Sequence, residues 1–252
     1  MWHNPRLLLA TADLLTLVGV LALVAALGVW ISRQPIAPLS RVVVTNQLKQ
    51  VQRSDLELAL QGLRGNMVSV SLDGVRSSLE KLAWVRRAEV RRRWPSTLEL
   101  TLHEQEAVAR WSEGSQQLVN VQGEVFYAGG SPAALDALPV FHGPLGSAPE
   151  LLARYRELVT VLEPTGRRPV QLTLTPRLAW QLRLDDGLSI ELGREQAKAP
   201  VLARLQRFAE VYGRVVATRT AKASSVDLRY PNGFVMRVLG AASGAVGVRG
   251  NS

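Results

Sequence analysis

The longest apolar stretch of the chain covers residues 14–32, with the sequence LLTLVGVLALVAALGVWIS and no charged residue. As a helix rising about 1.5 Å per residue it would span about 28 Å, close to the hydrocarbon thickness of a bilayer. A cleaved signal peptide and a buried core helix are the alternatives. The stretch is longer than a usual signal-peptide core, and only Arg6, against Asp13, precedes it. We therefore interpret it as an uncleaved transmembrane helix between a short tail, residues 1–13, and a proline-containing linker, residues 33–38.

Residues 39–106 alternate between strand and helix patterns and predict a small α+β domain. A valine-rich strand opens the domain, and two short amphipathic helices follow it. A capping box from Ser54 to Glu57 is expected to open the first helix, because each side chain can bond to the backbone of the other. Asp73 is the expected N-cap of the second helix.

The domain is expected to close with a β-hairpin at residues 84–104 that turns around Pro95, since proline cannot continue a strand ladder. After the turn, Leu98, Leu100 and Leu102 alternate with polar residues and are predicted to face the core. The resulting order is β-α-α-β-β. The first strand of the hairpin is too charged for a buried central strand and predicts an exposed face or edge. Its arginines are Arg86, Arg87, Arg91, Arg92 and Arg93.

Short strands and turns fill residues 107–239 and predict a second, larger β domain of antiparallel strands with flanking helices. Amphipathic helices are expected at residues 151–162 and 201–212. Residues 129–149 are rich in Gly, Pro and Ala and are expected to be mostly loop, while the Gly/Ala/Ser-rich residues 240–252 predict a disordered tail. Strands are expected at residues 107–111, 117–121, 124–127, 170–175, 179–184, 188–192, 226–230 and 234–238.

The positive charge of the chain does not by itself indicate a nucleic-acid partner. The net charge is +9, and 26 of the 30 basic residues are arginine, which codon usage in a GC-rich genome would explain. The basic residues are spread over the whole chain. Outside the hairpin at residues 84–104 they are not interleaved with the aromatic side chains on which bases stack. We therefore expect no nucleic-acid partner.

The sequence offers few residues that could act in catalysis or bind a metal ion. There is no cysteine, and the three histidines are not at ligand spacing. No serine lies in a nucleophile motif, and Asp185-Asp186-Gly187 is better explained as a hairpin turn than as a carboxylate pair. We therefore predict a protein that is not an enzyme and has no catalytic residues, no cofactor and no metal site.

The last hairpin is the best candidate for a binding surface. A strand at the end of a sheet has unpaired N–H and C=O groups that can accept a partner strand. Tyr230 and Phe234 flank its Pro231-Asn232-Gly233 turn and are of the residue types that dominate interfaces. In the alternative interpretation both aromatic rings pack inward, and the hairpin only completes the core.

Several stretches resemble, in order and spacing, the FtsQ/DivIB family of bacterial cell-division proteins. The resemblance implies a POTRA domain followed by a β domain in a single-pass inner-membrane protein. It implies a cytoplasmic N-terminus, a periplasmic bulk, a position at the division septum and a non-enzymatic scaffold role in the divisome. The chain departs from the family at Asn46, where the first strand often ends in glycine, and at Ala107, where proline often follows the hairpin. The similar stretches are WVRRAEVRRRWPSTLELTLHEQEAVARW, LVNVQGEVF, Leu192-Gly193-Arg194 and VDLRYPNGFVMRV.

The resemblance also implies that the C-terminal strand region receives a segment of FtsB, which comes with FtsL, as an added β-strand. The arginines would pair with partner carboxylates and Tyr230 would be an anchor. Other division proteins, FtsK, FtsW and FtsI among them, are further partners that it suggests. A POTRA-containing module for polypeptide transport or envelope assembly is the alternative function. The partner-binding residues expected on this chain are Arg194, Arg229, Tyr230, Asn232, Gly233, Phe234, Met236 and Val238.

Overall fold

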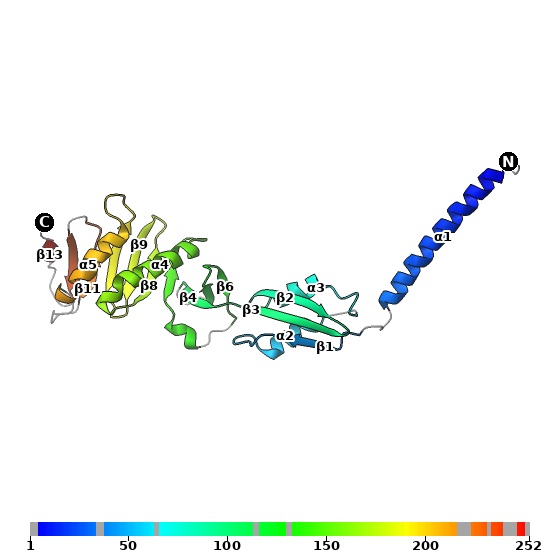
Figure 1. Cartoon of the computed structure of the whole chain (residues 1–252). Helices are drawn as coiled ribbons and strands as arrows, with labels where there is room; N and C mark the ends of the chain where they lie inside the picture. Colours follow the sequence, from blue (N-terminus) through cyan, green and yellow to red (C-terminus); the bar gives the residue numbers. More distant parts are fainter. Residues whose placement is uncertain are drawn as a thin grey trace. The chain divides into compact units, whose positions relative to one another are not determined.

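The computed structural model describes residues 5–33, 38–62, 66–112, 116–129, 133–215, 223–230, 233–238 and 246–249 (Figure 1). The chain divides into two compact units, residues 1–105 and 106–252.

The first element, helix α1 (Pro5–Arg33), contains the apolar stretch. Its segment Thr11–Trp30 has a mean hydropathy of 2.3 and is long and apolar enough to cross a membrane. The helix begins within the tail predicted at residues 1–13, nine residues before the apolar run. Proline suits the first position of a helix, and residues 6–13 contain no helix breaker, so the helix extends beyond the apolar residues.

The rest of the first unit has the predicted order β-α-α-β-β, which confirms this part of the fold. The elements form a three-stranded sheet in the order β1-β3-β2, with β1 parallel and β2 antiparallel to β3. Leu98, Leu100 and Leu102 are almost completely buried, as the alternation in the sequence predicted. The arginine-rich strand β2 lies at an edge of the sheet, also as predicted. The elements are β1 (Arg41–Val44), α2 (Arg53–Leu60), α3 (Leu72–Leu79), β2 (Val85–Arg93) and β3 (Thr97–Glu104).

The two helix caps differ from those expected. Helix α2 begins at Arg53, so Ser54 lies inside the helix, and the N-cap residue Gln52 makes no side-chain cap. Helix α3 is capped by Ser71, whose hydroxyl accepts a hydrogen bond from the Gly74 N–H at 3.1 Å. Asp73 lies in the first turn instead, where its negative charge still interacts favourably with the helix dipole.

Two polar side chains fasten strand β3 to the chain around β1. The side-chain amide of Asn46 donates to the Leu102 carbonyl at 2.8 Å and accepts from the Leu102 N–H at 3.1 Å. It therefore continues the β1–β3 ladder directly after the backbone hydrogen bond from the Thr45 N–H to the Leu100 carbonyl. The carboxylate of Glu104 accepts three consecutive backbone N–H groups, those of residues 49–51, each at 2.8 Å.

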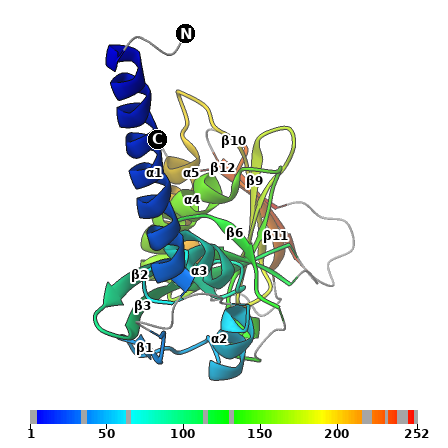
Figure 2. The same ribbon diagram turned by 90° about the vertical axis from the view of Figure 1, so that its right-hand side faces the viewer.

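The second unit is built, in its described residues, on a ten-stranded mixed sheet with the order β13-β12-β11-β10-β9-β8-β7-β4-β5-β6. Helices α4 (Ala148–Leu162) and α5 (Val201–Val215) pack against each other, and they lie on β8 and β10 respectively (Figure 2). Two short 3-10 helices are η1 (Ala133–Ala137) and η2 (Glu163–Thr165). The strands are β4 (Ala107–Trp111), β5 (Gln117–Asn120), β6 (Val125–Tyr127), β7 (Val140–His142), β8 (Pro169–Leu174), β9 (Ala179–Leu184), β10 (Ser189–Arg194), β11 (Ala223–Asp227), β12 (Gly233–Val238) and β13 (Val246–Arg249).

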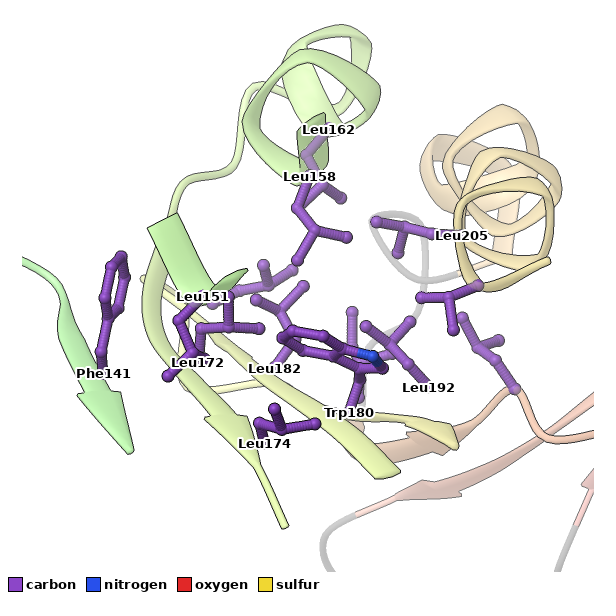
Figure 3. Close-up of a cluster of buried hydrophobic side chains, with 14 of the residues drawn as sticks. Phe141, Leu151, Leu158, Leu162, Leu172, Leu174, Trp180, Leu182, Leu192 and Leu205 are labelled. Carbon is purple, nitrogen blue, oxygen red and sulfur yellow. The ribbon is translucent and has the colours of Figure 1, made fainter. Parts of the chain in front are cut away.

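The core of this unit lies between the sheet and the two helices. Trp180 of β9 is at its centre, with leucines from neighbouring strands on one side and leucines of α4 and α5 on the other (Figure 3). Leu158 and Leu162 of α4 and Leu205 of α5 are completely buried. The amphipathic patterns of both helices therefore predicted their buried faces correctly.

Two strands of this sheet lie in segments that were not expected to contain one. Strand β7, within the predicted loop at residues 129–149, pairs parallel to both β4 and β8 and places Phe141 fully in the core. Its three residues between Pro139 and Gly143 are too few to show a periodic pattern. Strand β13 lies within the predicted disordered tail at residues 240–252 and pairs antiparallel with β12. The Gly/Ala/Ser-rich composition of the tail was therefore a poor guide at these four residues.

Candidate partner-binding edge

The expected partner-binding residues converge at one end of the sheet of the second unit. Strands β10 and β11 are parallel, so their carboxyl ends lie side by side. Arg194 ends β10, and Arg229 and Tyr230 are the second and third residues after the end of β11. Strand β12 is antiparallel to β11, so its first residue, Gly233, starts at the same end. The topology therefore brings residues almost 40 positions apart in the sequence onto one surface.

A glycine in β10 makes room for one of the arginines. The pairing of β9 with β10 shifts register between Glu191 and Gly193, and Gly193 has a φ of +73°. A methyl group at Gly193 would lie 2.8 Å from Cγ of Arg229, far inside van der Waals contact. Glycine is needed at this position both for the backbone angle and for the stem of Arg229, which crosses directly over it.

The guanidinium of Arg229 is held by Asp227. Its Nε donates to the two carboxylate oxygens at 2.9 and 3.0 Å, and its Nη2 donates to Oδ2 at 2.6 Å. The backbone N–H of Arg229 adds a bond to Oδ1 at 3.0 Å. The side-chain hydrogen bond is the main cause that holds the pKa of Asp227 below its ordinary value, and it also raises the pKa of Arg229. Arg229 is thus fixed in direction while 60% of its side chain stays exposed.

A buried arginine lies under the same glycine. Arg204 of α5 is 2% exposed, and its Nη2 donates to the backbone carbonyl of Arg194 at 2.6 Å. Its Nε and Nη1 find no partner among the described residues, and Nη1 would lie 3.6 Å from a methyl group at Gly193. Burial lowers the pKa of Arg204, and the nearby Glu195 opposes this shift. Arg204 therefore holds the end of β10, from which Arg194 reaches into solvent.

The two aromatic residues of the last hairpin have opposite environments. Tyr230 is 53% exposed. Phe234 is half-buried and packs edge-to-face on Phe208 of α5, with ring centroids 5.5 Å apart and an interplanar angle of 88°. Of the two interpretations of the hairpin, the surface one holds for Tyr230 and the inward-packing one for Phe234.

The remaining residues of β12 offer a partner mainly their backbone. Met236 is completely buried, and Val238 is half-buried against the core. The side chain of Met236 is therefore not a surface contact, contrary to the sequence-based expectation. The expected contact Asn232 lies outside the described residues. The outer edge of β12 is paired with β13, from Gly233 opposite Arg249 to Met236 opposite Val246.

Comparison with known proteins places this geometry in a family. Residues 37–105 match the model for the POTRA domain of FtsQ type, and residues 109–229 match the model for the C-terminal part of the cell-division protein FtsQ/DivIB. The chain is 38% identical over 242 residues to the cell-division protein FtsQ of Burkholderia pseudomallei, covering 95% of both chains. It is 34% identical to FtsQ of Nitrosospira multiformis (94% of this chain and 99% of the relative) and 32% identical to FtsQ of Neisseria gonorrhoeae (94% and 95%). The chain belongs to the FtsQ/DivIB family of cell-division proteins.

Family membership confirms the resemblance drawn from the sequence and assigns residues 37–105 of the first unit as a POTRA domain. The match to the C-terminal family model ends at Arg229. Tyr230 and strand β12 therefore lie just beyond the matched segment, and their role must be argued from this structure.

Sequence reasoning missed the two groups that organise this surface, although signals for both were present. Asp227 and Arg229 are two residues apart in an extended segment, a spacing that puts their side chains on one side. Arg204 lies three positions after Val201 and one before Leu205, within the apolar stripe of its helix, so it was bound to face the core. A charged residue in such a stripe indicates a buried polar contact.

The chemistry of this surface suits protein recognition. It combines two exposed arginines and an exposed tyrosine beside β12, whose outer edge is paired with β13. Arginines can pair with carboxylates, and the edge of a sheet can accept an added strand. Among the described residues, no group of three or more His, Asp or Glu side chains is placed to hold a metal ion.

Proposed function

We propose that this FtsQ-family chain is a non-enzymatic scaffold of the divisome that binds the FtsB–FtsL pair at the end of its β-domain sheet. The proposal is supported chiefly by the convergence of Arg194, Arg229 and Tyr230 beside the first residue of β12. An incoming strand of FtsB would pair with the backbone of β12, so the proposal concerns its outer edge rather than its buried side chains.

Each side chain has a distinct proposed role. Tyr230 would be the anchor, because an exposed aromatic ring can bury a large area at little entropic cost. The side chain of Arg194 is exposed and makes no hydrogen bond or ion pair with the described residues, so it would take a partner carboxylate directly. Arg229 would keep its hydrogen bonds to Asp227 and donate to the partner from Nη1, which takes part in none of its bonds to that carboxylate.

We further propose that the N-terminus lies in the cytoplasm and both folded units in the periplasm, with the protein at the division septum. Helix α1 and family membership support a single-pass membrane protein in division. A fluorescent protein that matures in the periplasm, fused to the C-terminus, should label the septum. A uniform envelope signal in dividing cells would contradict the septal role.

The POTRA domain is proposed to contact other division proteins, with FtsK, FtsW and FtsI as candidates. Strand β1 lies at the other edge of its sheet, and Val42 and Val43 are both more than one-third exposed there. The alternative role in polypeptide transport is disfavoured, because the POTRA match is of FtsQ type and the near full-length relatives are cell-division proteins.

The partner site can be tested with the double variant Tyr230→Ala, Arg229→Glu in the full chain. We expect it to lose capture of co-expressed FtsB and FtsL while the second unit stays folded, because both residues are exposed. A matched control is Tyr127→Ala, Arg183→Glu. Tyr127 is 58% exposed, close to the 53% of Tyr230, and the charge change is the same.

The control variant should capture the FtsB–FtsL pair as the unchanged chain does. Full capture by the Tyr230/Arg229 variant would refute the site. Equal loss in both variants would show that net charge, rather than this surface, governs the capture.

A further inference from the structure

The outer edge of β12 is covered in this structure by a segment of the same chain. Four residue pairs connect β12 to β13, and β13 is the end strand of the sheet. This edge is also the one on which the proposed function places a partner strand. The two strands cannot occupy it together, because each backbone N–H and C=O of β12 that points outward has one place in a ladder.

We propose that segment 246–249 is an internal substitute for the partner strand, which covers the β12 edge in the free protein and is displaced when the partner binds. This inference rests on the proposed function for the identity of the competing strand. The self-pairing itself does not depend on it.

The length of β12 explains why its outer edge needs to be paired in the free protein. A six-residue strand at the end of a sheet would expose a row of unpaired donors and acceptors, a template for aggregation. The opposite end of the same sheet is protected differently, because its end strand β6 has only three residues. The chain thus has a long end strand on one side only, and its own C-terminal segment pairs with that strand.

Segment 246–249 is suited to displacement because it is short and its charge has the same sign as that of the surface beside it. It has four residues against the six of β12, and one of the four is glycine, which weakens a strand. Its one charged residue, Arg249, is opposite Gly233 at the end of β12 near Arg194 and Arg229, and it has the same sign as these two arginines. A partner strand with acidic residues would form the same ladder and add charge pairs that the internal segment cannot make.

The seven residues 239–245 tether the internal segment, so it competes at a high local concentration that dilution does not change. A cover present in roughly 70–90% of molecules would reduce the apparent affinity for the partner about three- to tenfold. Removing the cover should increase the affinity by the same factor.

The first arm of the test needs no partner. Hydrogen exchange of the full chain is compared with that of a chain ending at Leu239 and with the double variant Gly247→Pro, Val248→Pro. Neighbouring N–H groups point to opposite sides of a strand, so a pair of prolines must remove a bond to β12. We expect faster exchange of those amides of residues 233–236 that face β13 and unchanged exchange in β10. The control is Gly250→Pro, because residue 250 lies outside the paired residues.

The second arm measures the affinity of the same four proteins for the co-expressed periplasmic parts of FtsB and FtsL. Faster exchange together with a three- to tenfold gain in affinity for the truncated and double-proline chains would support the proposal. Unchanged exchange would overturn the self-pairing. Faster exchange with equal or weaker binding would overturn the competition. Faster exchange with no binding by any of the four proteins would refute the proposed function, and the competition with it, while self-pairing would stand.

Discussion

The contact between Gly193 and Arg229 allows a sharp test of how the candidate site is built. Replacing Gly193 with alanine adds one methyl group at a residue with φ +73°, and that methyl would lie 2.8 Å from Cγ of Arg229. The side chain of Arg229 must therefore move, and its bonds to Asp227 must break. Gly187 in the β9–β10 turn is a matched control, because it has a φ of +89° and open space where a methyl group would be.

Both substitutions lose stability through the backbone angle, but only Gly193→Ala also disturbs the pair Arg229–Asp227. A left-handed backbone angle costs an L-residue about 1–2 kcal/mol, so both variants should lose that much stability. In a unit of this size 1 kcal/mol corresponds to about 4 °C, so each melting temperature should fall by about 4–8 °C. Loss of the exposed pair Arg229–Asp227 adds less than about 1 kcal/mol in Gly193→Ala. Stability alone would thus hardly distinguish the variants.

Binding should distinguish them clearly. Displacing an arginine that contributes to an interface typically weakens binding about 10- to 100-fold, or roughly 1.4–2.7 kcal/mol. Calorimetry gives the melting temperatures of the second unit, and titration with the FtsB–FtsL pair gives the affinities. We expect weaker binding for Gly193→Ala and an affinity within twofold of the unchanged chain for Gly187→Ala. Equal affinities at similar melting temperatures would refute the argument that Gly193 positions Arg229 for a partner.

Three further predictions concern stability. Asn46→Ala should lower the free energy of unfolding of the POTRA domain by about 1–2 kcal/mol, since two hydrogen bonds to Leu102 are lost. Asn46→Asp should cost at least as much, because an acceptor replaces the donor. The hydrogen-exchange rates of the slowest β3 amides would measure both effects. Glu104→Ala should cost about 2–3 kcal/mol and Glu104→Gln about half of that, because glutamine keeps one acceptor oxygen; a ranking opposite to this would contradict the capping role. The pKa of Asp227 is lowered in the folded state. Its contribution to the free energy of unfolding is therefore complete above the unfolded pKa near 4, and it disappears as the pH falls through the lower folded pKa. The difference in free energy of unfolding between the unchanged chain and Asp227→Asn should be constant above about pH 5 and shrink below pH 4.

The sequence predicts best where a periodic pattern runs over many residues. The alternating leucines of β3 and the apolar faces of α4 and α5 were all correctly placed in the two cores. Features that depend on a single residue, such as helix N-caps, were predicted less well. Both Ser54 and Asp73 are good N-cap types, but other residues of the same turns occupy the N-cap positions. Local capping preference is about 1 kcal/mol, which the packing of the helix can outweigh.

The exposure of the expected residues can be compared with the sequence, whereas their role in partner binding stays a prediction. Tyr230 is exposed, as the surface interpretation of the hairpin requires, and the exposed Arg194 and Arg229, which the family resemblance suggested, lie at the same end of the sheet. The contacts that hold those arginines were not foreseen. Gly193 meets the side chain of Arg229 through the pairing of β10 with β11, and Arg204 reaches the carbonyl of Arg194 from α5. The contact between Asp227 and Arg229 is local, and only the spacing of the two residues indicated it. Asn46, which departs from the family pattern, is explained only by the structure, because its amide replaces backbone pairing.

The two ends of the β-domain sheet explain why a strand-accepting site should lie at β12 and not elsewhere. Strand β6 also exposes a tyrosine and a valine, Tyr127 and Val125, so exposed apolar residues do not distinguish the ends. Length does: three residues offer at most a few ladder bonds, whereas six residues offer enough to make a specific register. Charge adds to this, since Arg229, which Gly193 and Asp227 position, lies beside β12. A partner strand would therefore gain both backbone pairing and ion pairs at this end. At the same end the chain supplies β13, which in the proposed competition is displaced before a partner strand can pair.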